Sequence, residues 1–376
     1  MHRPIQELIH DYVRGLPVYV PGKPIEEVER ELKIKAVKLA SNENPLGPSP
    51  LAAEAVRRAV AEGHRYPDGG SLLLREKLAE RHGVKPEQIF VGLGTSEIID
   101  VAARALLKAG LEGLTSKGTF ALYPIAIRAA GARLVETPLM DYGFDLSAMA
   151  QAITPQTRII YLANPNNPTG TMFTATEFER FLEGVPEDVL VVLDEAYFEY
   201  VDHDDYSRSV ELVKGGRSLL VLRTFSKVYG LAGLRIGYGI GPAGLAPELN
   251  KLRTPFNVSN LAQAAAMAAL DDTEHVRRSV EMNRAGLQQI EKGLAELGLR
   301  AVPSVTNFVL LDLGMDATKF SDELLKLGVI VRPMGWMGLP GAVRVTVGTR
   351  EENEKFLRAT AQVWPSLAMS AGATRR

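Results

Sequence analysis

Short apolar runs alternate with amphipathic stretches over most of the first 270 residues. Residues 51–63 ("LAAEAVRRAVAEG") and 71–83 ("SLLLREKLAERHG") carry apolar side chains three or four positions apart, and each stretch ends at a glycine. This spacing predicts two amphipathic helices. Residues 189–193 are apolar without interruption, which is typical of a strand in a parallel sheet that helices cover on both faces. The alternation therefore predicts an α/β fold with a mostly parallel sheet between helices.

The pattern changes near residue 272. Residues 272–298 read as one long charged helix, and a smaller α+β segment follows it. That segment contains strands in "TNFVLLDLG", "VIVRP" and "VRVTVG" and helices at 317–327 and from 351. We therefore expect an N-terminal arm that also contributes to a small domain (1–49), a large α/β domain (50–275), the small C-terminal domain (276–368) and a disordered tail (369–376).

The composition narrows the class of protein. The chain is 46% hydrophobic and 23% charged, with a formal net charge of −2, whereas a nucleic-acid-binding protein normally carries a basic face. It has no apolar stretch of the ~18 residues that a membrane span needs, and its start lacks the layout of a secretory signal. There is no cysteine, and the six histidines show no metal-ligand spacing. We expect a cytoplasmic enzyme without a metal, a nucleic-acid partner or a membrane partner.

Polar clusters follow four of the predicted strands, at 94–97, 164–170, 194–197 and 224–227. In open α/β sheets, ligands bind beyond the carboxyl ends of the strands. The four clusters are therefore expected to meet at one edge of the sheet, and this convergence is the first indication of a functional site.

Two of these clusters have chemistry that can be read directly. "GLGT" at 92–95 opens a helix, so its backbone N–H groups could hold a phosphate, although an ordinary strand–helix turn explains it equally well. A dinucleotide fingerprint would need glycine at position 97, which is glutamate. The P-loop pattern is absent as well. Asp194 ends an apolar strand, where a carboxylate needs a cation or several donors. A protonated heterocycle nitrogen would serve, and a helix N-cap is the simpler alternative.

The other two clusters add an amine and amide donors. Lys227 lies in "TFSKVYGLAGLRIGYGIG", eight residues before Arg235. Arginine binds phosphate through two parallel hydrogen bonds, and lysine forms Schiff bases with carbonyl cofactors. Alone, Lys227 would be an ordinary solvated lysine. Two prolines stiffen the "NPNNPTG" loop, and we expect the amides of Asn164 and Asn167 to be donors that point toward the sheet edge. Together these groups predict a site for a phosphorylated pyridine aldehyde.

A series of motifs supports that interpretation, and they are "KLASNENPLGPSP", "RYPDGG", "GTSEII", "NPNNPTG", "DEAYFEY", "RTFSKVYGLAGLRIGY" and "VRVTVGT". With these motifs the chain resembles the fold-type I pyridoxal-phosphate aminotransferases over nearly its full length. Within them it is most similar to the histidinol-phosphate aminotransferase family.

The resemblance implies a role for each matching residue. Lys227 would bind the cofactor's aldehyde, Asp194 would pair with its ring nitrogen, and Tyr197 and Asn167 would bind its phenolic oxygen. Phe120 would stack on the ring. The residues implied to hold the phosphate are Gly94, Thr95, Ser96, Thr224, Ser226, Arg235 and, from the other subunit of a homodimer with shared active sites, Tyr66. The residues implied to bind substrate are Tyr19, Asn42, Arg332 and Arg344, of which Arg344 would clamp the α-carboxylate.

The resemblance also implies an activity. It is the ping-pong transamination of L-histidinol phosphate and imidazole acetol phosphate with 2-oxoglutarate and glutamate, in which the freed Lys227 amine moves the Cα proton. Two departures favour an aromatic amino acid (phenylalanine or tyrosine) as an alternative substrate. The loop "RPMGWMGLPGA" is apolar around Trp336, and Phe256 stands where many members have tyrosine. Packing of Trp336 against the small domain would explain the first departure equally well. A threonine-phosphate-type decarboxylase shares most of these residues and is a further alternative.

Overall fold

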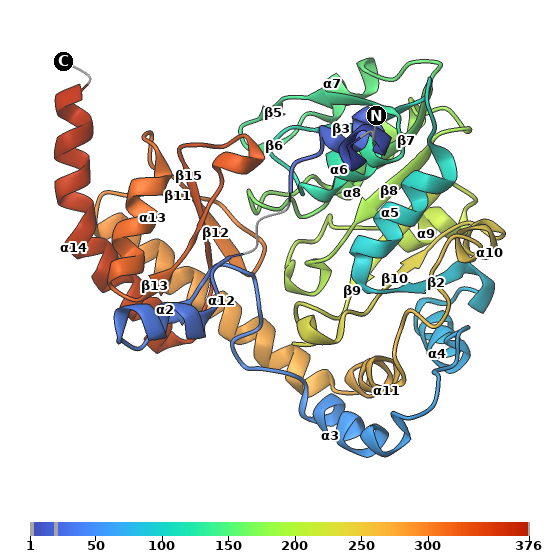
Figure 1. Ribbon diagram of the computed structural model, residues 1–376, viewed down its shortest axis with the longest axis horizontal. Helices are drawn as coiled ribbons and strands as arrows, with labels where there is room; N and C mark the ends of the chain where they lie inside the picture. The colour runs from blue at the N-terminus through green and yellow to red at the C-terminus, as the bar shows by residue number, and fades with distance from the viewer. Residues whose placement is uncertain (1–3, 19–21, 375–376) are drawn as a thin grey trace.

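The computed structural model describes residues 4–18 and 22–374. They form a large body and a smaller one, and the long helix α12 (Thr273–Glu296) runs along the lower side of both (Figure 1). Helix α12 packs against α14 (Arg350–Thr374) in the small body and against the short helix η4 (Phe198–Tyr200) in the large one. Since α12 belongs to both bodies, the division into domains at 50–275 and 276–368 remains our proposal.

The large body is built on a seven-stranded sheet with the order β2-β10-β9-β8-β7-β3-β4. Five neighbouring strands, from β9 to β4, are parallel, and β10 runs antiparallel to both β2 and β9. The predicted α/β class with a mostly parallel sheet is confirmed. The strands are β2 (Ile89–Gly92), β3 (Glu112–Ser116), β4 (Arg133–Thr137), β7 (Thr157–Ala163), β8 (Leu190–Asp194), β9 (Leu219–Thr224) and β10 (Gly237–Ile240).

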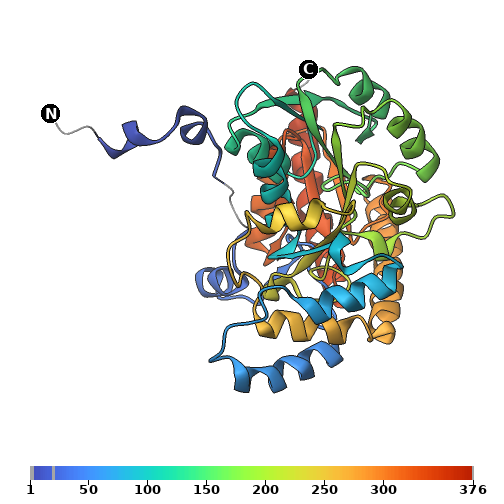
Figure 2. The same cartoon turned by 90° about the vertical axis from the view of Figure 1, so that its right-hand side faces the viewer.

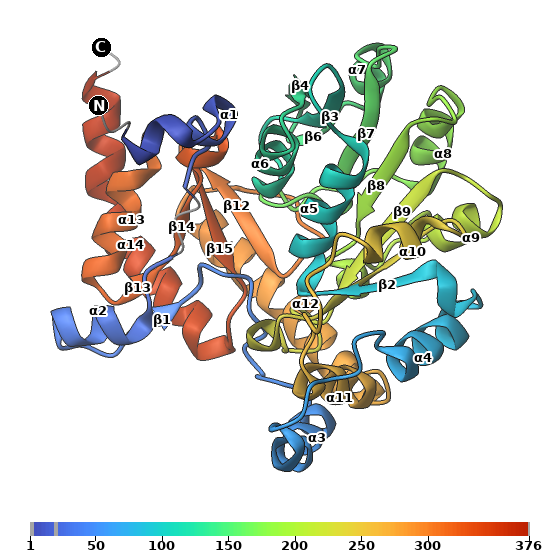
Figure 3. The same cartoon turned by 45° about the vertical axis from the view of Figure 1, so that its right-hand side comes forward.

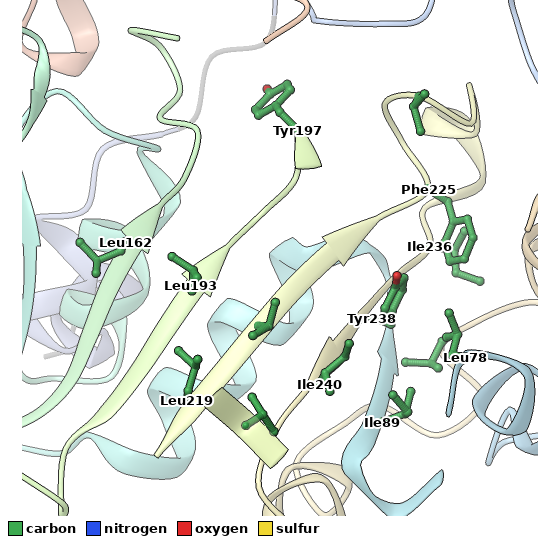
Figure 4. Close-up of a cluster of buried hydrophobic side chains, with 14 of the residues drawn as sticks. Leu78, Ile89, Leu162, Leu193, Tyr197, Leu219, Phe225, Ile236, Tyr238 and Ile240 are labelled. Carbon is green, nitrogen blue, oxygen red and sulfur yellow. The ribbon is translucent and has the colours of Figure 1, made fainter. Parts of the chain in front are cut away.

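The sheet lies between two hydrophobic cores because its central strands are apolar on both faces. In β8, Val191 and Leu193 join one core, while Leu190 and Val192 join the other. Successive side chains of a strand point to opposite faces, so an unbroken apolar run serves both cores. Figure 4 shows part of the first core, where side chains from several strands pack together.

Helices cover each face of this sheet. The first core is covered by α3 (Pro50–Ala59), α4 (Leu72–His82), α7 (Leu146–Gln151), α8 (Ala175–Glu183), α9 (Ser209–Lys214) and α11 (Asn260–Ala269). The second is covered by α5 (Gly94–Leu106), α6 (Leu122–Ala129) and α10 (Leu245–Asn250). Short elements complete this body, namely β5 (Leu139–Met140), β6 (Gly143–Phe144), η2 (Val60–Glu62), η3 (Pro86–Gln88) and η5 (Ala232–Leu234).

The small body draws on segments from both ends of the chain. Its antiparallel sheet has the order β11-β12-β15-β14, and β1 pairs in parallel with β13. Figure 3 shows this sheet as a separate layer with α13 and α14 on its outer side. Its elements are α2 (Ile25–Leu32), β1 (Val37–Lys38), β11 (Ala301–Val302), β12 (Phe308–Asp312), α13 (Ala317–Lys326), β13 (Val329–Ile330), β14 (Arg332–Pro333), η6 (Gly335–Met337) and β15 (Ala342–Thr346).

The C-terminal end of the chain differs from our expectation. Helix α14 continues to Thr374, although we expected a disordered tail from 369. Alanine and methionine favour a helix, and one glycine costs only about 1 kcal/mol there, so the helix has no strong reason to stop. At the other end, η1 (Ile5–Leu8) and α1 (Asp11–Arg14) form an arm that extends to one side (Figure 2), and α1 packs against α6 of the large body. None of the described helices is long and apolar enough to cross a membrane.

Candidate active site

A cavity of about 270 Å³ opens at the carboxyl ends of the central strands. Ala163, Asp194 and Thr224 are the last residues of β7, β8 and β9, and all three line it. The predicted clusters therefore do meet at one sheet edge. The predicted cofactor-binding residues that line the cavity are Gly94, Thr95, Ser96, Phe120, Asn167, Asp194, Tyr197, Thr224, Ser226, Lys227 and Arg235.

Lys227 is a partly buried amine rather than a solvated lysine. It lies in the loop after β9, and its Nζ is 3.4 Å from the carbonyl oxygen of Asn42 and 5.6 Å from the centre of the Tyr197 ring. Burial, together with the positive charges of Arg344 and Arg235, lowers the pKa of Lys227 to about 8, although the carboxylates of Glu43 and Asp194 act in the opposite direction. A useful fraction of this amine is therefore neutral near pH 7, as a nucleophile must be.

Asp194 is a buried carboxyl group that has few partners for its charge. Its Oδ2 accepts a hydrogen bond from the Tyr123 hydroxyl at 3.0 Å, and its Oδ1 accepts one from the backbone N–H of Ala196 at 3.2 Å. Burial raises the pKa of Asp194 to about 6, although both hydrogen bonds and the Lys227 charge act in the opposite direction. The bond from Ala196 resembles the cap alternative, but Asp194 also lines the cavity, where a cation such as a protonated ring nitrogen could approach it.

The predicted phosphate-binding corner lies at the start of α5. This helix begins at Gly94, so Thr95 and Ser96 belong to its first turn, where backbone N–H groups have no partner within the helix. Gly94 has a φ of +70°, and a Cβ there would lie 2.8 Å from Nη2 of Arg235. The guanidinium thus packs directly on the glycine backbone. On the opposite side, Thr224 Oγ1 accepts from the backbone N–H of Ser226 at 3.0 Å.

The groups around the cavity fit pyridoxal phosphate. The Lys227 amine and the Asp194 carboxyl group line the same cavity as the first turn of α5, whose backbone N–H groups could hold a phosphate, and the Phe120 ring lines it beside them. Tyr197 and Asn167 add polar atoms on the small-domain side. The Tyr197 hydroxyl accepts from Asn42 Nδ2 at 2.9 Å, and Asn167 Oδ1 accepts from Arg344 Nη1 at 2.5 Å.

Arg344 and Asn42, two of the predicted substrate-binding residues, do not line the cavity themselves but bind to residues that do. Arg344 is buried, and its Nη2 donates to the carbonyl oxygen of Ala40 at 2.7 Å. Asn42 has a positive φ of 55°, and its Oδ1 accepts from the Thr346 hydroxyl at 3.0 Å. Since its amide also binds Tyr197, Asn42 orders the groups around the cavity, and direct contact with a substrate remains a prediction.

Other predicted residues lie elsewhere. Arg332 is buried in the small domain, with its guanidinium 5.0 Å from the ring centre of Trp336, and it is not among the residues that line the cavity. Tyr66 is 83% exposed and stacks on Phe256, with 4.8 Å between ring centroids. It does not line the cavity of its own chain, so a role there requires a second subunit. Tyr19 lies outside the described residues.

One expectation from the sequence is wrong. We expected the amide of Asn164 to point toward the sheet edge as a donor. Instead its Nδ2 donates to the carbonyl oxygen of Phe173 at 2.9 Å, and its Oδ1 accepts from the N–H of the same residue at 3.0 Å. The side chain is used to close its own loop, because a buried amide must satisfy both its donor and its acceptor.

Sequence reasoning also missed residues of the site. Tyr123 was not singled out, although it lies only three residues after Phe120, and in the structure it stands in the first turn of α6 with its ring edge-on to the Phe120 ring, 5.5 Å between centroids. Ser41 and Glu43 line the cavity as well, from the segment after β1. Among the described residues, no three histidine, aspartate or glutamate side chains are close enough together to hold a metal ion.

Comparison with known proteins identifies relatives over most of the chain. The family pattern for aminotransferase class I and II matches residues 34–359. The chain is 49% identical to histidinol-phosphate aminotransferase 2 of Pseudomonas fluorescens, and the match covers 93% of this chain and 96% of the relative. It is 50% identical to histidinol-phosphate aminotransferase 1 of Nitrosococcus oceani, with 92% and 94% covered.

Solved structures agree with this result. The crystal structure of histidinol-phosphate aminotransferase from Sinorhizobium meliloti in complex with pyridoxal-5′-phosphate matches with a TM-score of 0.88 and 32% identity, over 96% of this chain and 98% of that one. An aspartate aminotransferase from Thermus thermophilus matches with a TM-score of 0.79 and 26% identity, over 93% of this chain and 99% of that one.

Proposed function

This chain belongs to the class I and II aminotransferase family, and from that premise we propose that it moves the amino group of L-histidinol phosphate to 2-oxoglutarate. It is a pyridoxal-phosphate-dependent enzyme. The observation that carries the proposal is the cavity in which the Lys227 amine, the Asp194 carboxyl group and the phosphate-binding corner meet.

Different residues of this chain have different roles in the proposed reaction. When bound, pyridoxal phosphate supplies an electron-withdrawing ring that stabilises negative charge on the carbon beside it. Arg235 and the first turn of α5 would hold the phosphate, and Asp194 would keep the ring nitrogen protonated. Lys227 would hold the cofactor through its amine, and its Nζ, once free, would move the proton at the substrate Cα. A pKa of about 8 suits an amine that must both accept and release a proton near neutral pH.

Arg344 is proposed to bind the anionic group next to the reacting carbon. Glutamate presents a carboxylate there, whereas histidinol phosphate presents a phosphate ester one carbon away. A guanidinium can bind either group through two hydrogen bonds. Arg344 can therefore serve both halves of a ping-pong cycle. Tyr19 and Arg332 are proposed to line the pocket for the rest of the substrate.

The structure weakens the case for an aromatic amino acid as the main substrate. Of the apolar loop before β15, Met334 and Met337 are buried and pack with Leu310 and Ala342 in a core of the small domain. The hydrophobicity of this loop is thus mostly explained by packing. Trp336 is 44% exposed and is the residue that keeps the aromatic alternative open.

We also propose a homodimer that acts in the cytoplasm. Tyr66 and Phe256 are 83% and 48% exposed and stack on each other, and exposed apolar surfaces of this kind mark interfaces. A cytoplasmic location is proposed because the substrates are charged metabolites that do not cross a bilayer unaided.

A spectral titration tests the substrate. The protein loaded with pyridoxal phosphate is titrated with histidinol phosphate, glutamate, phenylalanine and tyrosine, and the absorbance of the lysine-bound cofactor is followed. We expect histidinol phosphate and glutamate to remove that absorbance at the lowest concentrations. Stronger conversion by phenylalanine or tyrosine would establish the aromatic alternative instead. A protein that stays colourless after soaking in the cofactor would overturn the whole proposal.

A further inference from the structure

A buried ion pair lies directly behind the cavity. Glu195 follows Asp194 at the end of β8, and Arg223 precedes Thr224 at the end of β9. The Glu195 and Arg223 side chains are 0% and 8% exposed. In the part of the chain that the structure describes, no other ion pair has both side chains less than a tenth exposed. None of the functions proposed above uses this pair.

The pair has a well-defined geometry. Arg223 donates from Nε and Nη2 to the same Glu195 oxygen, Oε2, at 3.0 Å and 2.8 Å. The hydroxyl of Ser207 donates to the other oxygen, Oε1. The guanidinium carbon of Arg223 also lies 3.3 Å from the centre of the Phe198 ring. Each charged group is therefore held on more than one side.

The strand register places this pair one residue away from the cavity on both strands. Strands β8 and β9 are parallel neighbours, Asp194 is level with Leu222, and the N–H of Glu195 donates to the Leu222 carbonyl at 2.9 Å. Since side chains alternate along an extended chain, Asp194 and Thr224 face the cavity while Glu195 and Arg223 face away from it. The pair thus joins the two strand ends that carry the cofactor-binding groups.

Stability alone does not account for such a pair. Taking two charges out of water costs about as much as their attraction returns, and apolar replacements of similar volume are often neutral. What the two hydrogen bonds from Arg223 to one Glu195 oxygen do supply is a fixed distance and orientation. We propose that Glu195 and Arg223 are positioning residues that set the spacing between Asp194 and the Thr224–Lys227 loop. This inference rests on the cofactor-binding roles proposed above for Asp194 and Lys227.

The decisive experiment separates position from stability. The double variant Glu195→Leu with Arg223→Met replaces the pair by apolar groups, and Arg284→Met, which breaks the exposed pair with Asp202, is the control. We expect the double variant to unfold within a few degrees of the wild type. Its kcat with glutamate should nevertheless fall about 10-fold or more, as expected for misplaced reacting groups, and the absorbance maximum of the bound cofactor should shift. Wild-type kcat and spectrum in a stable double variant would overturn the proposal.

A second variant covers the case in which the double variant does not fold. Arg223→Lys keeps the charge but cannot make the two-fold contact, so we expect a folded protein with kcat lowered several-fold and KM for glutamate unchanged. An unaltered kcat and cofactor spectrum in this variant would also refute the positioning role. The proposed function is checked separately, with the wild type alone. A wild-type protein that binds the cofactor but does not react with glutamate would contradict the proposed function, whatever the two variants show.

Discussion

Arg344 donates a hydrogen bond from Nη1 to Oδ1 of Asn167 at 2.5 Å, although the two residues are 177 positions apart and come from different domains. A second bond from Nη2 to the Ala40 carbonyl, at 2.7 Å, orients the same guanidinium. The proposed substrate clamp is thus held in place before a substrate arrives, and it touches a residue proposed to bind the cofactor. Preorganisation of this kind lowers the entropy cost of binding.

Replacing Arg344 should weaken binding of every substrate. We expect Arg344→Ala to raise the KM for glutamate and for histidinol phosphate by about 10- to 150-fold, the equivalent of losing a hydrogen-bonded charge contact of about 1.5–3 kcal/mol. Arg344→Lys keeps the charge but loses the forked contact, so its KM values should lie between those of the wild type and those of Arg344→Ala. The measurement is a half-reaction titration with each substrate. A large change in the preference between side chains would show that the clamp is placed wrongly.

Replacing Lys227 should abolish the covalent attachment of the cofactor. We expect Lys227→Ala to lose the absorbance of the lysine-bound cofactor and essentially all turnover. Lys227→Arg, which keeps a positive charge but cannot form a Schiff base, should behave in the same way. Borohydride reduction of the wild type, followed by peptide mass spectrometry, should place the cofactor on the peptide that contains Lys227. Turnover by either variant would rule out this role.

Uptake of the cofactor should depend on pH through Lys227. Only the neutral amine attacks an aldehyde, and the pKa of Lys227 is lowered from 10.5 to about 8. At pH 7 about a tenth of such an amine is neutral, against about three in ten thousand for an ordinary lysine. The rate at which cofactor-free protein binds pyridoxal phosphate should therefore rise with pH up to about 8 and then level off.

The control for this measurement is a small lysine analogue, whose rate should keep rising to about pH 10.5. Because Arg344 lowers the pKa of Lys227, Arg344→Ala should move the midpoint to higher pH. A wild-type midpoint near that of the free amine would contradict the lowered pKa.

Replacing Asp194 should slow the chemical step. We expect Asp194→Ala to lower kcat by about 100-fold or more, because the ring nitrogen would lose the carboxylate that keeps it protonated. Asp194→Asn keeps the shape and one acceptor but not the charge, and it should lose nearly as much. Single-turnover absorbance measurements with glutamate report this step. An unchanged rate in both variants would be incompatible with the proposed role.

Replacing Gly94 should damage the phosphate-binding corner. A Cβ at this position would lie 2.8 Å from Arg235 Nη2, and the φ of +70° disfavours any other residue. We expect Gly94→Ala to raise the dissociation constant for pyridoxal phosphate about 10-fold or more through backbone strain of roughly 1–2 kcal/mol. The matched control is Gly233→Ala, where a Cβ would meet nothing within 4 Å. Equal affinities in the two variants would argue against this geometry.

Much of the fold and the reactive groups could be predicted from local patterns. Apolar runs such as residues 189–193 indicated buried parallel strands, and the polar residues that end them, including Asp194, pointed to the sheet edge where the cavity lies. Lys227 was recognisable from its neighbours in sequence. These predictions depend on periodicity and on residues close together in the chain, and both are readable without a structure.

Contacts between distant residues could not be predicted in this way. Tyr123 reaches Asp194 across 71 positions, and Asn42 reaches Tyr197 across 155. The Asn164 amide, which sequence reasoning assigned to the cavity, turns instead to Phe173. Each outcome depends on which groups compete for the same hydrogen bond once the chain is packed.

The sequence by itself determined which segments form helices and strands, which polar residues end the strands, and which residues are the amine and the acid. These features follow from side-chain chemistry and local spacing. Only the tertiary structure decided how far Lys227 is buried, which partner Asp194 has and where Arg344 points. Burial and long-range electrostatics set the pKa values of Lys227 and Asp194, and neither exists until the chain has folded around the cavity.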